Sequence, residues 1–387
     1  MDVFTFPTSK FAAEHAVICF SHLRWDFVFQ RPQHLLGRFS KRHNVLFVEE
    51  PIYDGGDPRF VVTSKSDGLK VAVPHLPHGT DVTATDTLMR QLLDRLIQEQ
   101  GIENFVAWYY TPMMLGWNDH LRPLAVVYDC MDELSAFKNA PPELHAREAE
   151  LFARADLVFT GGRSLFEAKR GQHPAVYCFP SSIDAKHFAR ALDVGTDPDD
   201  QVNIPHPRIG FCGVIDERSD IRLLRRIAEM RRDWQFVMLG PVVKIDENDL
   251  PRLENIHYLG AKSYDDLPEY IGGWDVAMMP FALNESTRFI SPTKTPEYLA
   301  AGLPVVSTPI HDVVRPYGEA GLVKIAATPE EFVESIQAAL SEDLAEHRRK
   351  ADEFLGTMSW DKTYEAMSEL IEESIASKTH AVATAQI

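Results

Sequence analysis

The stretch SPTKTPEYLAAGLPVVSTP, residues 291–309, joins a polar lead-in to a short helix, a Gly-x-Pro break and an apolar strand. Thr295 is a suitable helix N-cap, and Pro296 suits the first helical position. Gly302 can end the helix, and residues 305–306 predict the start of a buried strand. A short helix leading directly into a buried strand is typical of α/β folds.

Two charged residues, Lys294 and Glu297, stand at the beginning of that helix. The carboxylate has a simple structural explanation, because an acidic residue in the first turn interacts favourably with the helix dipole. The lysine opposes the dipole unless an anion binds there, and helix N-termini do bind phosphates. A lysine suits a phosphate oxygen and a carboxylate suits the ribose hydroxyls, so this turn is a candidate nucleotide diphosphate site.

Composition places the chain among ordinary globular proteins. It has 387 residues, 45% hydrophobic and 25% charged, and this length favours two domains. No apolar run approaches the roughly 18 residues of a membrane-spanning helix. The first 15 residues lack the apolar core of a signal peptide. The four cysteines are far apart without metal-ligand spacing, which predicts buried free thiols and no metal centre.

The net charge of −18 is unevenly distributed. Residues 1–190 contain 20 basic and 23 acidic side chains, so most of the excess negative charge lies in the second half. This argues against a nucleic-acid partner. Residues 15–45 are instead basic, with Asp26 as their one acidic residue. The helical stretch RPQHLLGRFSKRH, residues 31–43, either faces an anionic membrane or acceptor, or covers a sheet with its bases in solvent.

Short apolar runs alternate with helical patterns along the chain, which predicts parallel sheets. The polar, Asp- and Pro-rich stretch 191–207 interrupts the alternation and is the best linker candidate. We therefore predict an N-terminal domain over 1–195 and a C-terminal domain over 205–359. A last helix, 360–378, is expected to pack back on the first domain, and the residues after it are expected to be frayed. In two doubly wound domains the cleft between them is the expected active site.

Further site candidates follow strands of the second domain. In GFCGVIDERSDIRLL, residues 210–224, Gly213 permits close backbone approach, and Arg218 stands before a helix where a phosphate would bind. A plain strand–helix turn with a surface arginine is the alternative. Gly240 ends another strand at the same edge of the sheet, where its backbone can flank a base or a ribose.

These pieces, in this order, resemble the C-terminal domain of GT-B glycosyltransferases, especially the retaining family 4. The resemblance implies an α/β protein of the GT-B type, with two doubly wound Rossmann-like domains facing across a cleft. It implies that the ribose is held by Glu297 and the diphosphate by Arg218 and Lys294. The implied donor-nucleotide site comprises Gly213, Arg218, Gly240, Thr293, Lys294 and Glu297. The first glutamate of the family motif is replaced by Phe289, and Glu285 is an alternative whose reach the sequence leaves open.

The stretch SHLRWDFVFQRPQHLLGRF, residues 21–39, follows the first strand and resembles a bacterial subgroup found with surface-polysaccharide, teichuronic-acid and galactofuranose genes. We predict that Asp26 or His22 acts as general base on an acceptor hydroxyl. A tryptophan can stack on a sugar and an arginine can bind a phosphate. The predicted acceptor-binding residues are Arg24, Trp25, Arg31 and Asp132. The alternatives are a loop held by internal ion pairs and a helix cap at Asp132.

The sequence therefore predicts a glycosyltransferase that uses a nucleotide diphosphate sugar, most simply a UDP-sugar, and a surface-glycan or lipid-linked acceptor. No cofactor and no metal are expected. Retention of configuration is favoured and inversion stays open. We expect a cytoplasmic protein at the inner face of the membrane, touching it peripherally through the basic N-terminal region. The alternatives are a GT-B nucleotide-sugar epimerase and a non-catalytic protein that binds sugar nucleotides.

Overall fold

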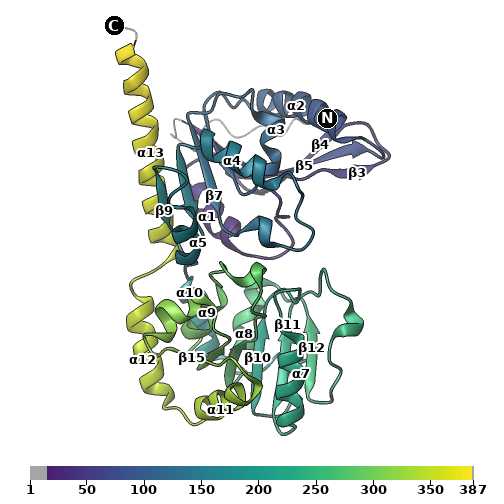
Figure 1. Ribbon diagram of the computed structural model, residues 1–387, viewed down its shortest axis with the longest axis vertical. Coiled ribbons are helices and arrows are strands. Elements are labelled where there is room, and N and C mark those ends of the chain that lie inside the picture. The colour runs from purple at the N-terminus through teal and green to yellow at the C-terminus, as the bar shows by residue number, and fades with distance from the viewer. Residues whose placement is uncertain (1–14, 386–387) are drawn as a thin grey trace.

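The computed structural model describes residues 15–385, which form two α/β domains (Figure 1). The strands of the first domain are β1 (Ala16–Ser21), β2 (Val45–Glu49), β3 (Ile52–Asp54), β4 (Arg59–Ser66), β5 (Leu69–Pro77), β6 (Phe105–Tyr109), β7 (Ala125–Cys130), β8 (Leu157–Thr160) and β9 (Val176–Cys178). All nine form one sheet, with the order β3-β5-β2-β1-β6-β7-β8-β9 and β4 paired with β5 beside this path. All pairings are parallel except that of β4.

Helices cover both faces of this sheet. They are α1 (Arg31–Phe39), α2 (Val82–Glu99), α3 (Leu115–Asn118), α4 (Leu144–Arg154), α5 (Arg163–Lys169) and α6 (Ala185–Phe188). One apolar cluster joins the sheet to α2 and α4. A second cluster joins the opposite face to α1, whose Leu35, Leu36 and Phe39 are buried. The apolar side of α1 thus belongs to the core, which supports the sheet-covering alternative for this helix.

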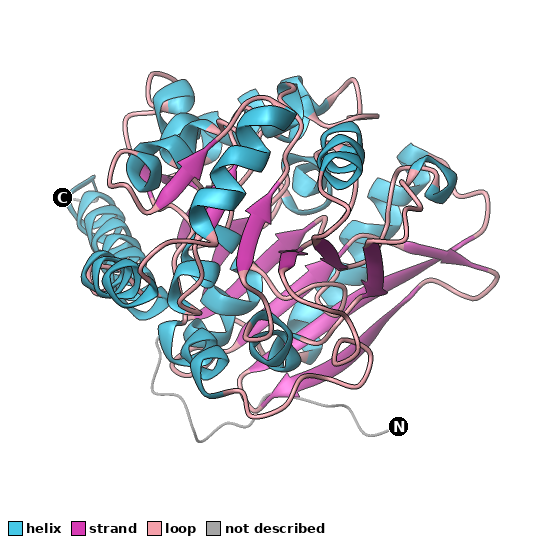
Figure 2. Ribbon diagram, turned by 90° about the horizontal axis from the view of Figure 1, so that it is seen from below, coloured by secondary structure: helices cyan, strands magenta, loops and turns pink. Residues whose placement is uncertain are grey.

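The second domain contains β10 (Arg208–Cys212), β11 (Gln235–Leu239), β12 (Ile256–Gly260), β13 (Val276–Met279), β14 (Val305–Ser307) and β15 (Val323–Ile325). They form a parallel sheet in the order β12-β11-β10-β13-β14-β15. Its helices are α7 (Ile221–Met230), α8 (Leu267–Ile271), α9 (Lys294–Ala300), α10 (His311–Val313), α11 (Pro329–Ala339) and α12 (Leu344–Leu355). Apolar clusters lie on both faces of this sheet, so the domain is doubly wound. Figure 2 shows the strands of the molecule with helices packed around them.

The last helix, α13 (Trp360–Ala385), leaves the second domain and runs along the first (Figure 1). Trp360 stacks on His34 with ring centroids 4.6 Å apart, and Asp361 accepts a hydrogen bond of 2.7 Å from Arg38. Tyr364 and residues 367–371 complete the apolar cluster over α1. The helix continues to Ala385, further than the expected end at 378, so the tail that the sequence suggested to be frayed is helical up to that residue.

Helix α9 begins two residues earlier than the sequence suggests. Its N-cap is Thr293, not Thr295, and no side chain caps it. Thr295 is fully buried, and its hydroxyl contacts the sulfur of Met279. The predicted end of the helix is confirmed, because Gly302 adopts a left-handed φ of 79° directly before β14.

Candidate functional site

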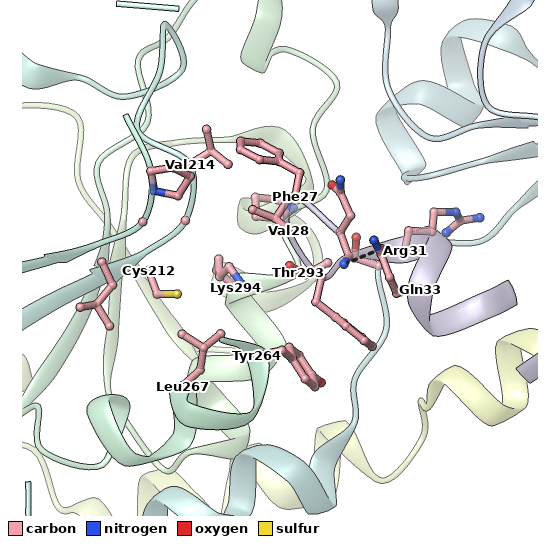
Figure 3. A pocket seen from close by; sticks show the side chains of 18 of the residues that line it. Phe27, Val28, Arg31, Gln33, Cys212, Val214, Tyr264, Leu267, Thr293 and Lys294 are labelled. Carbon is pink, nitrogen blue, oxygen red and sulfur yellow. Dashed lines mark hydrogen bonds between the residues drawn. The ribbon is translucent and has the colours of Figure 1, made fainter. Parts of the chain in front are cut away.

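A cavity of about 480 Å³ lies between the two domains, at the carboxyl ends of both sheets. Side chains of both domains point into it (Figure 3), with Phe27 and Val28 from the loop after β1 and Lys294 from the start of α9. Parallel sheets place their site-forming loops at this edge, so the cavity lies where the fold predicts an active site. Phe29 closes one end by stacking on Tyr264 of the second domain, with centroids 4.1 Å apart.

The floor of the cavity requires two glycines. Gly213 follows β10 and Gly240 follows β11, and both line the cavity. Gly240 has a φ of 138°, and a Cβ there would collide with the carbonyl oxygen of Gly213. The two turns can therefore approach each other only because residue 240 has no side chain. This leaves backbone exposed to a ligand at the ends of neighbouring strands.

Lys294 and Glu297 form an ion pair in the cavity wall. Lys294 Nζ lies 2.6 Å from Glu297 Oε2, and both side chains are largely buried. Burial on its own lowers the pKa of Lys294, but the Glu297 carboxylate more than compensates, and the pKa is raised above its usual value. Lys294 is therefore a permanently charged cation that lines the cavity, whereas its partner Glu297 does not line it.

Arg218 is a second oriented cation. Its guanidinium makes hydrogen bonds of 2.7–3.1 Å to both oxygens of buried Asp216, which fixes its direction. It lines the same cavity as Lys294. The guanidinium carbon also lies 5.6 Å from the ring centroid of Phe137, a residue of the first domain, and Lys244 Nζ lies 5.2 Å from that centroid. Phe137 and Lys244 are contacts that sequence reasoning missed.

Two of the predicted acceptor-binding arginines are already engaged within the first domain. Arg31 is buried and binds both oxygens of Asp129 at 2.9–3.1 Å. Arg24 lies 2.9 Å from Glu49 and does not line the cavity. Both arginines hold the loop in place, as the ion-pair alternative proposed, although with partners that the sequence did not indicate. Trp25 does line the cavity and also packs edge-on against a buried core ring.

The candidate bases differ strongly in environment. The Asp26 side chain is 73% exposed and lies 2.7 Å from Lys65. His22 does not line the cavity, and burial lowers its pKa to about 4. Asp132 lines the cavity, and burial raises its pKa to about 6, opposed in part by Arg218 and Arg31. It does not cap the following helix, whose N-cap is Glu133. Asp132 is therefore a cavity-lining carboxyl group whose pKa is raised by its environment.

Residue 289, where the family motif has its first glutamate, does not point into the cavity. Phe289 packs against the apolar cluster of the first domain and does not line the cavity. The Glu285 side chain is 76% exposed, lies 3.5 Å from Arg288, and also lies outside the cavity lining. Neither residue supplies a carboxylate to the cavity in this structure.

Comparisons with known proteins agree with this architecture. Residues 206–342 match the family model described as "Glycosyl transferases group 1". The chain is 31% identical over 253 residues to the "Putative teichuronic acid biosynthesis glycosyltransferase TuaH" of Bacillus subtilis (strain 168). That alignment covers 58% of this chain and spans 62% of the length of the relative. The predicted resemblance is thus confirmed, with the second domain carrying the family match.

Solved structures resemble the whole fold. Sucrose-phosphate synthase from Thermosynechococcus elongatus aligns with a TM-score of 0.69 and 15% identity, covering 94% of this chain and 100% of that one. A structure described as "Trehalose-6-phosphate from E. coli bound with UDP-2-fluoro glucose" aligns with a TM-score of 0.68 and 14% identity, covering 92% of this chain and 99% of that one. The structure of Anabaena HepE in complex with UDP and glucose aligns with a TM-score of 0.65 and 12% identity, covering 92% of this chain and 99% of that one. The predicted GT-B fold, with two Rossmann-like domains, is confirmed.

Proposed function

We propose that this chain is a glycosyltransferase that moves a sugar from a nucleotide diphosphate donor, most simply a UDP-sugar, to a surface-glycan or lipid-linked acceptor. The observation that carries the proposal is the shared lining of one interdomain cavity by two oriented cations, Arg218 and Lys294. A group 1 family match in the second domain and a relative named for teichuronic acid biosynthesis support the same reaction class.

The two cations would stabilise the leaving diphosphate. Breaking the bond between sugar and phosphate leaves negative charge on the departing group, and positive groups fixed in advance lower the cost of that charge. Asp216 and Glu297 fix Arg218 and Lys294 through short contacts, so little reorganisation is needed. Glu297 accepts the hydrogen bond of Lys294 through Oε2, and in this proposal its Oε1 accepts one from a ribose hydroxyl. Gly213, Gly240 and Thr293 complete the proposed donor-nucleotide site.

The acceptor would bind against the loop after β1, with Trp25 and Asp132 nearest the reacting groups. If configuration is retained, which the family resemblance favours, the leaving phosphate can take the acceptor proton and no separate base is required. If configuration is inverted, a base is needed on the other face of the sugar. Asp132 is the better candidate in this structure, because it is half-buried in the cavity wall and its pKa is raised to about 6, whereas the Asp26 side chain is 73% exposed.

A cytoplasmic location at the inner face of the membrane, with peripheral contact, belongs to the same proposal. Among residues 15–385 no helix combines the length and the apolar character required to cross a bilayer. The support for a peripheral contact is the exposed basic pair Lys41–Arg42 after α1. Sedimentation with vesicles containing anionic lipid, with and without both bases replaced by glutamine, tests the contact. Equal sedimentation of the two proteins would contradict it.

Calorimetry with UDP in the presence of a chelator tests the donor site. We expect UDP to bind without added divalent metal, because Arg218 and Lys294 supply the positive charge. Glu297→Gln should weaken UDP binding by roughly 1–3 kcal/mol, the scale of a hydrogen bond to a charged group. It should also lower the melting temperature, because Lys294 loses its buried partner.

The chelator tests whether UDP binding needs a metal, and the Glu297→Gln variant tests whether Glu297 contributes to UDP binding. Loss of UDP affinity on chelation would contradict the metal-free donor site. A lower melting temperature with unchanged UDP affinity would leave Glu297 with a structural role only. Release of UDP from a UDP-sugar, measured with and without an acceptor glycan, then distinguishes transfer from binding alone.

A further inference from the structure

Two histidines and a glutamate meet at the edge of the first domain opposite the cavity. His15 directly precedes β1, whose carboxyl end faces the cavity, so it lies at the other edge of the sheet. His43 lies between α1 and β2, and Glu372 lies on α13. Their candidate ligand atoms all lie within 4.8 Å of one another. Three elements that are remote in sequence therefore bring ligand-type side chains to one point.

The local geometry leaves nitrogen lone pairs available. His15 Nε2 lies 3.7 Å from Glu372 Oε1, and the two imidazole centroids are 4.6 Å apart. His43 Nδ1 lies 3.3 Å from the backbone carbonyl oxygen of His15. A carbonyl can only accept, so Nδ1 of His43 carries the proton and Nε2 carries the lone pair. Such a carbonyl contact is the usual device that orients a metal-binding histidine.

We propose that His15, His43 and Glu372 bind a divalent transition metal such as Zn²⁺. Bonds of about 2.0–2.1 Å in a tetrahedral arrangement place neighbouring ligand atoms roughly 3.3 Å apart. His15 Nε2 and Glu372 Oε1, 3.7 Å apart, are close to this spacing, and the other ligand atoms, within 4.8 Å, would move inward when the metal binds. Two imidazoles and one carboxylate suit zinc, and the exposed carboxylate side leaves a fourth position for water.

A metal at this point would tie α13 to the first domain. It would join the start of β1, the segment after α1 and the crossing helix, and so would stabilise their packing by binding only the folded arrangement. None of the three residues lines the cavity, so this site and the proposed donor site can be tested independently. No spacing motif reveals the site, because its ligands are distributed over positions 15, 43 and 372.

The test uses the full chain, stripped with a chelator, dialysed and titrated with Zn²⁺ by calorimetry. We expect binding of one equivalent and a higher melting temperature with Zn²⁺. Glu372→Gln, at an exposed position, should weaken Zn²⁺ binding at least tenfold and remove the thermal shift. The matched control is Glu373→Gln, an exposed neighbour on the same helix, which should bind Zn²⁺ within twofold of the parent. His43→Gln should weaken binding like Glu372→Gln.

The outcome that overturns the proposal is clear from the same titrations. Absence of one-equivalent binding at micromolar Zn²⁺, or equal binding by the parent and Glu372→Gln, would exclude this site. The melting temperature of metal-free Glu372→Gln, compared with the metal-free parent, checks that the variant is folded. UDP affinity should be unchanged in Glu372→Gln, whatever the fate of the donor-site proposal.

Discussion

At the residue scale, two carboxylates with similar positions in the sequence differ in their exposure to solvent. Asp26 and Asp132 both follow strands of the first domain, and both line the cavity. Asp26 is hydrated and paired with a lysine at the surface, whereas burial raises the pKa of Asp132 to about 6. A group that exchanges a proton near neutral pH needs a pKa near that pH, so Asp132 is better suited to contact an acceptor hydroxyl.

If transfer inverts configuration and so requires a protein base, we predict that Asp132→Asn lowers it by roughly 100-fold, the scale of general acid–base catalysis. In the parent, transfer should fall about tenfold per pH unit below pH 6, as Asp132 gains a proton. The transfer rate of Asp132→Asn should not show this fall below pH 6. Asp26→Asn should remain within about threefold of the parent, and both variants should keep UDP affinity within twofold. Initial rates from pH 5 to 8 measure all of this. A severe defect in Asp26→Asn alone would restore Asp26 as the base.

A contact between two side chains can be predicted where the partners are close in sequence. Lys294 and Glu297 are three residues apart, and their pairing follows from helical spacing. Arg31 was predicted to bind the acceptor, and it lines the cavity, but its guanidinium is bound by Asp129, 98 residues away. Nothing near Arg31 in the sequence indicates that partner. Likewise, the sequence shows that Phe289 stands where the family motif has a glutamate. The structure adds that its ring packs on the apolar cluster of the first domain.

At the scale of elements, two strand ends determine the shape of the donor site. The turns after β10 and β11 approach each other so closely that only glycine fits at position 240. The alternation of apolar runs and helical patterns predicted both strands. The close approach itself depends on the register between β10 and β11, which a single sequence does not give.

We predict that Gly240→Ala destabilises the protein by about 3 kcal/mol or more, because it combines a backbone collision with an unfavourable φ. It should also weaken UDP binding. The control is Gly37→Ala within α1, where a Cβ would meet no atom within 4 Å. That change should stabilise by roughly 0.5–1 kcal/mol. Urea unfolding measures both, and a Gly240→Ala variant of parental stability would show that the turns can separate.

At the scale of the whole molecule, buried histidines make the fold sensitive to acid. Burial, with a smaller contribution from the neighbouring His43, lowers the pKa of His15 to about 4, and burial lowers that of His22 to about 4. Burial, with the nearby Arg38, Lys294 and His187, lowers the pKa of His34 well below its usual value. Each of these side chains binds a proton more readily when the chain unfolds. Their contribution to stability is therefore present above about pH 6.5 and is lost as the pH falls towards 4.

We predict that the urea midpoint falls steadily from pH 7 to pH 4.5. Each such histidine contributes at most about 1.4 kcal/mol per pH unit in this window. His34 is the informative position, because its ring stacks on Trp360 where α1 meets α13. His34→Phe keeps an aromatic ring but cannot titrate, so its unfolding should depend less on pH than that of the parent. The same slope in both proteins would assign the acid sensitivity to other groups.

The crossing of α13 also sets an order for the maturation of the chain during translation. Phe39 of the first domain is covered in part by α13, since Tyr364 packs edge-on against it in the same apolar cluster. The ribosome makes residues 205–359 before this helix exists. The second domain can therefore finish folding while the first still shows an uncovered aromatic face. For that interval the nascent chain exposes a surface that suits a chaperone, and the synthesis of α13 ends the exposure.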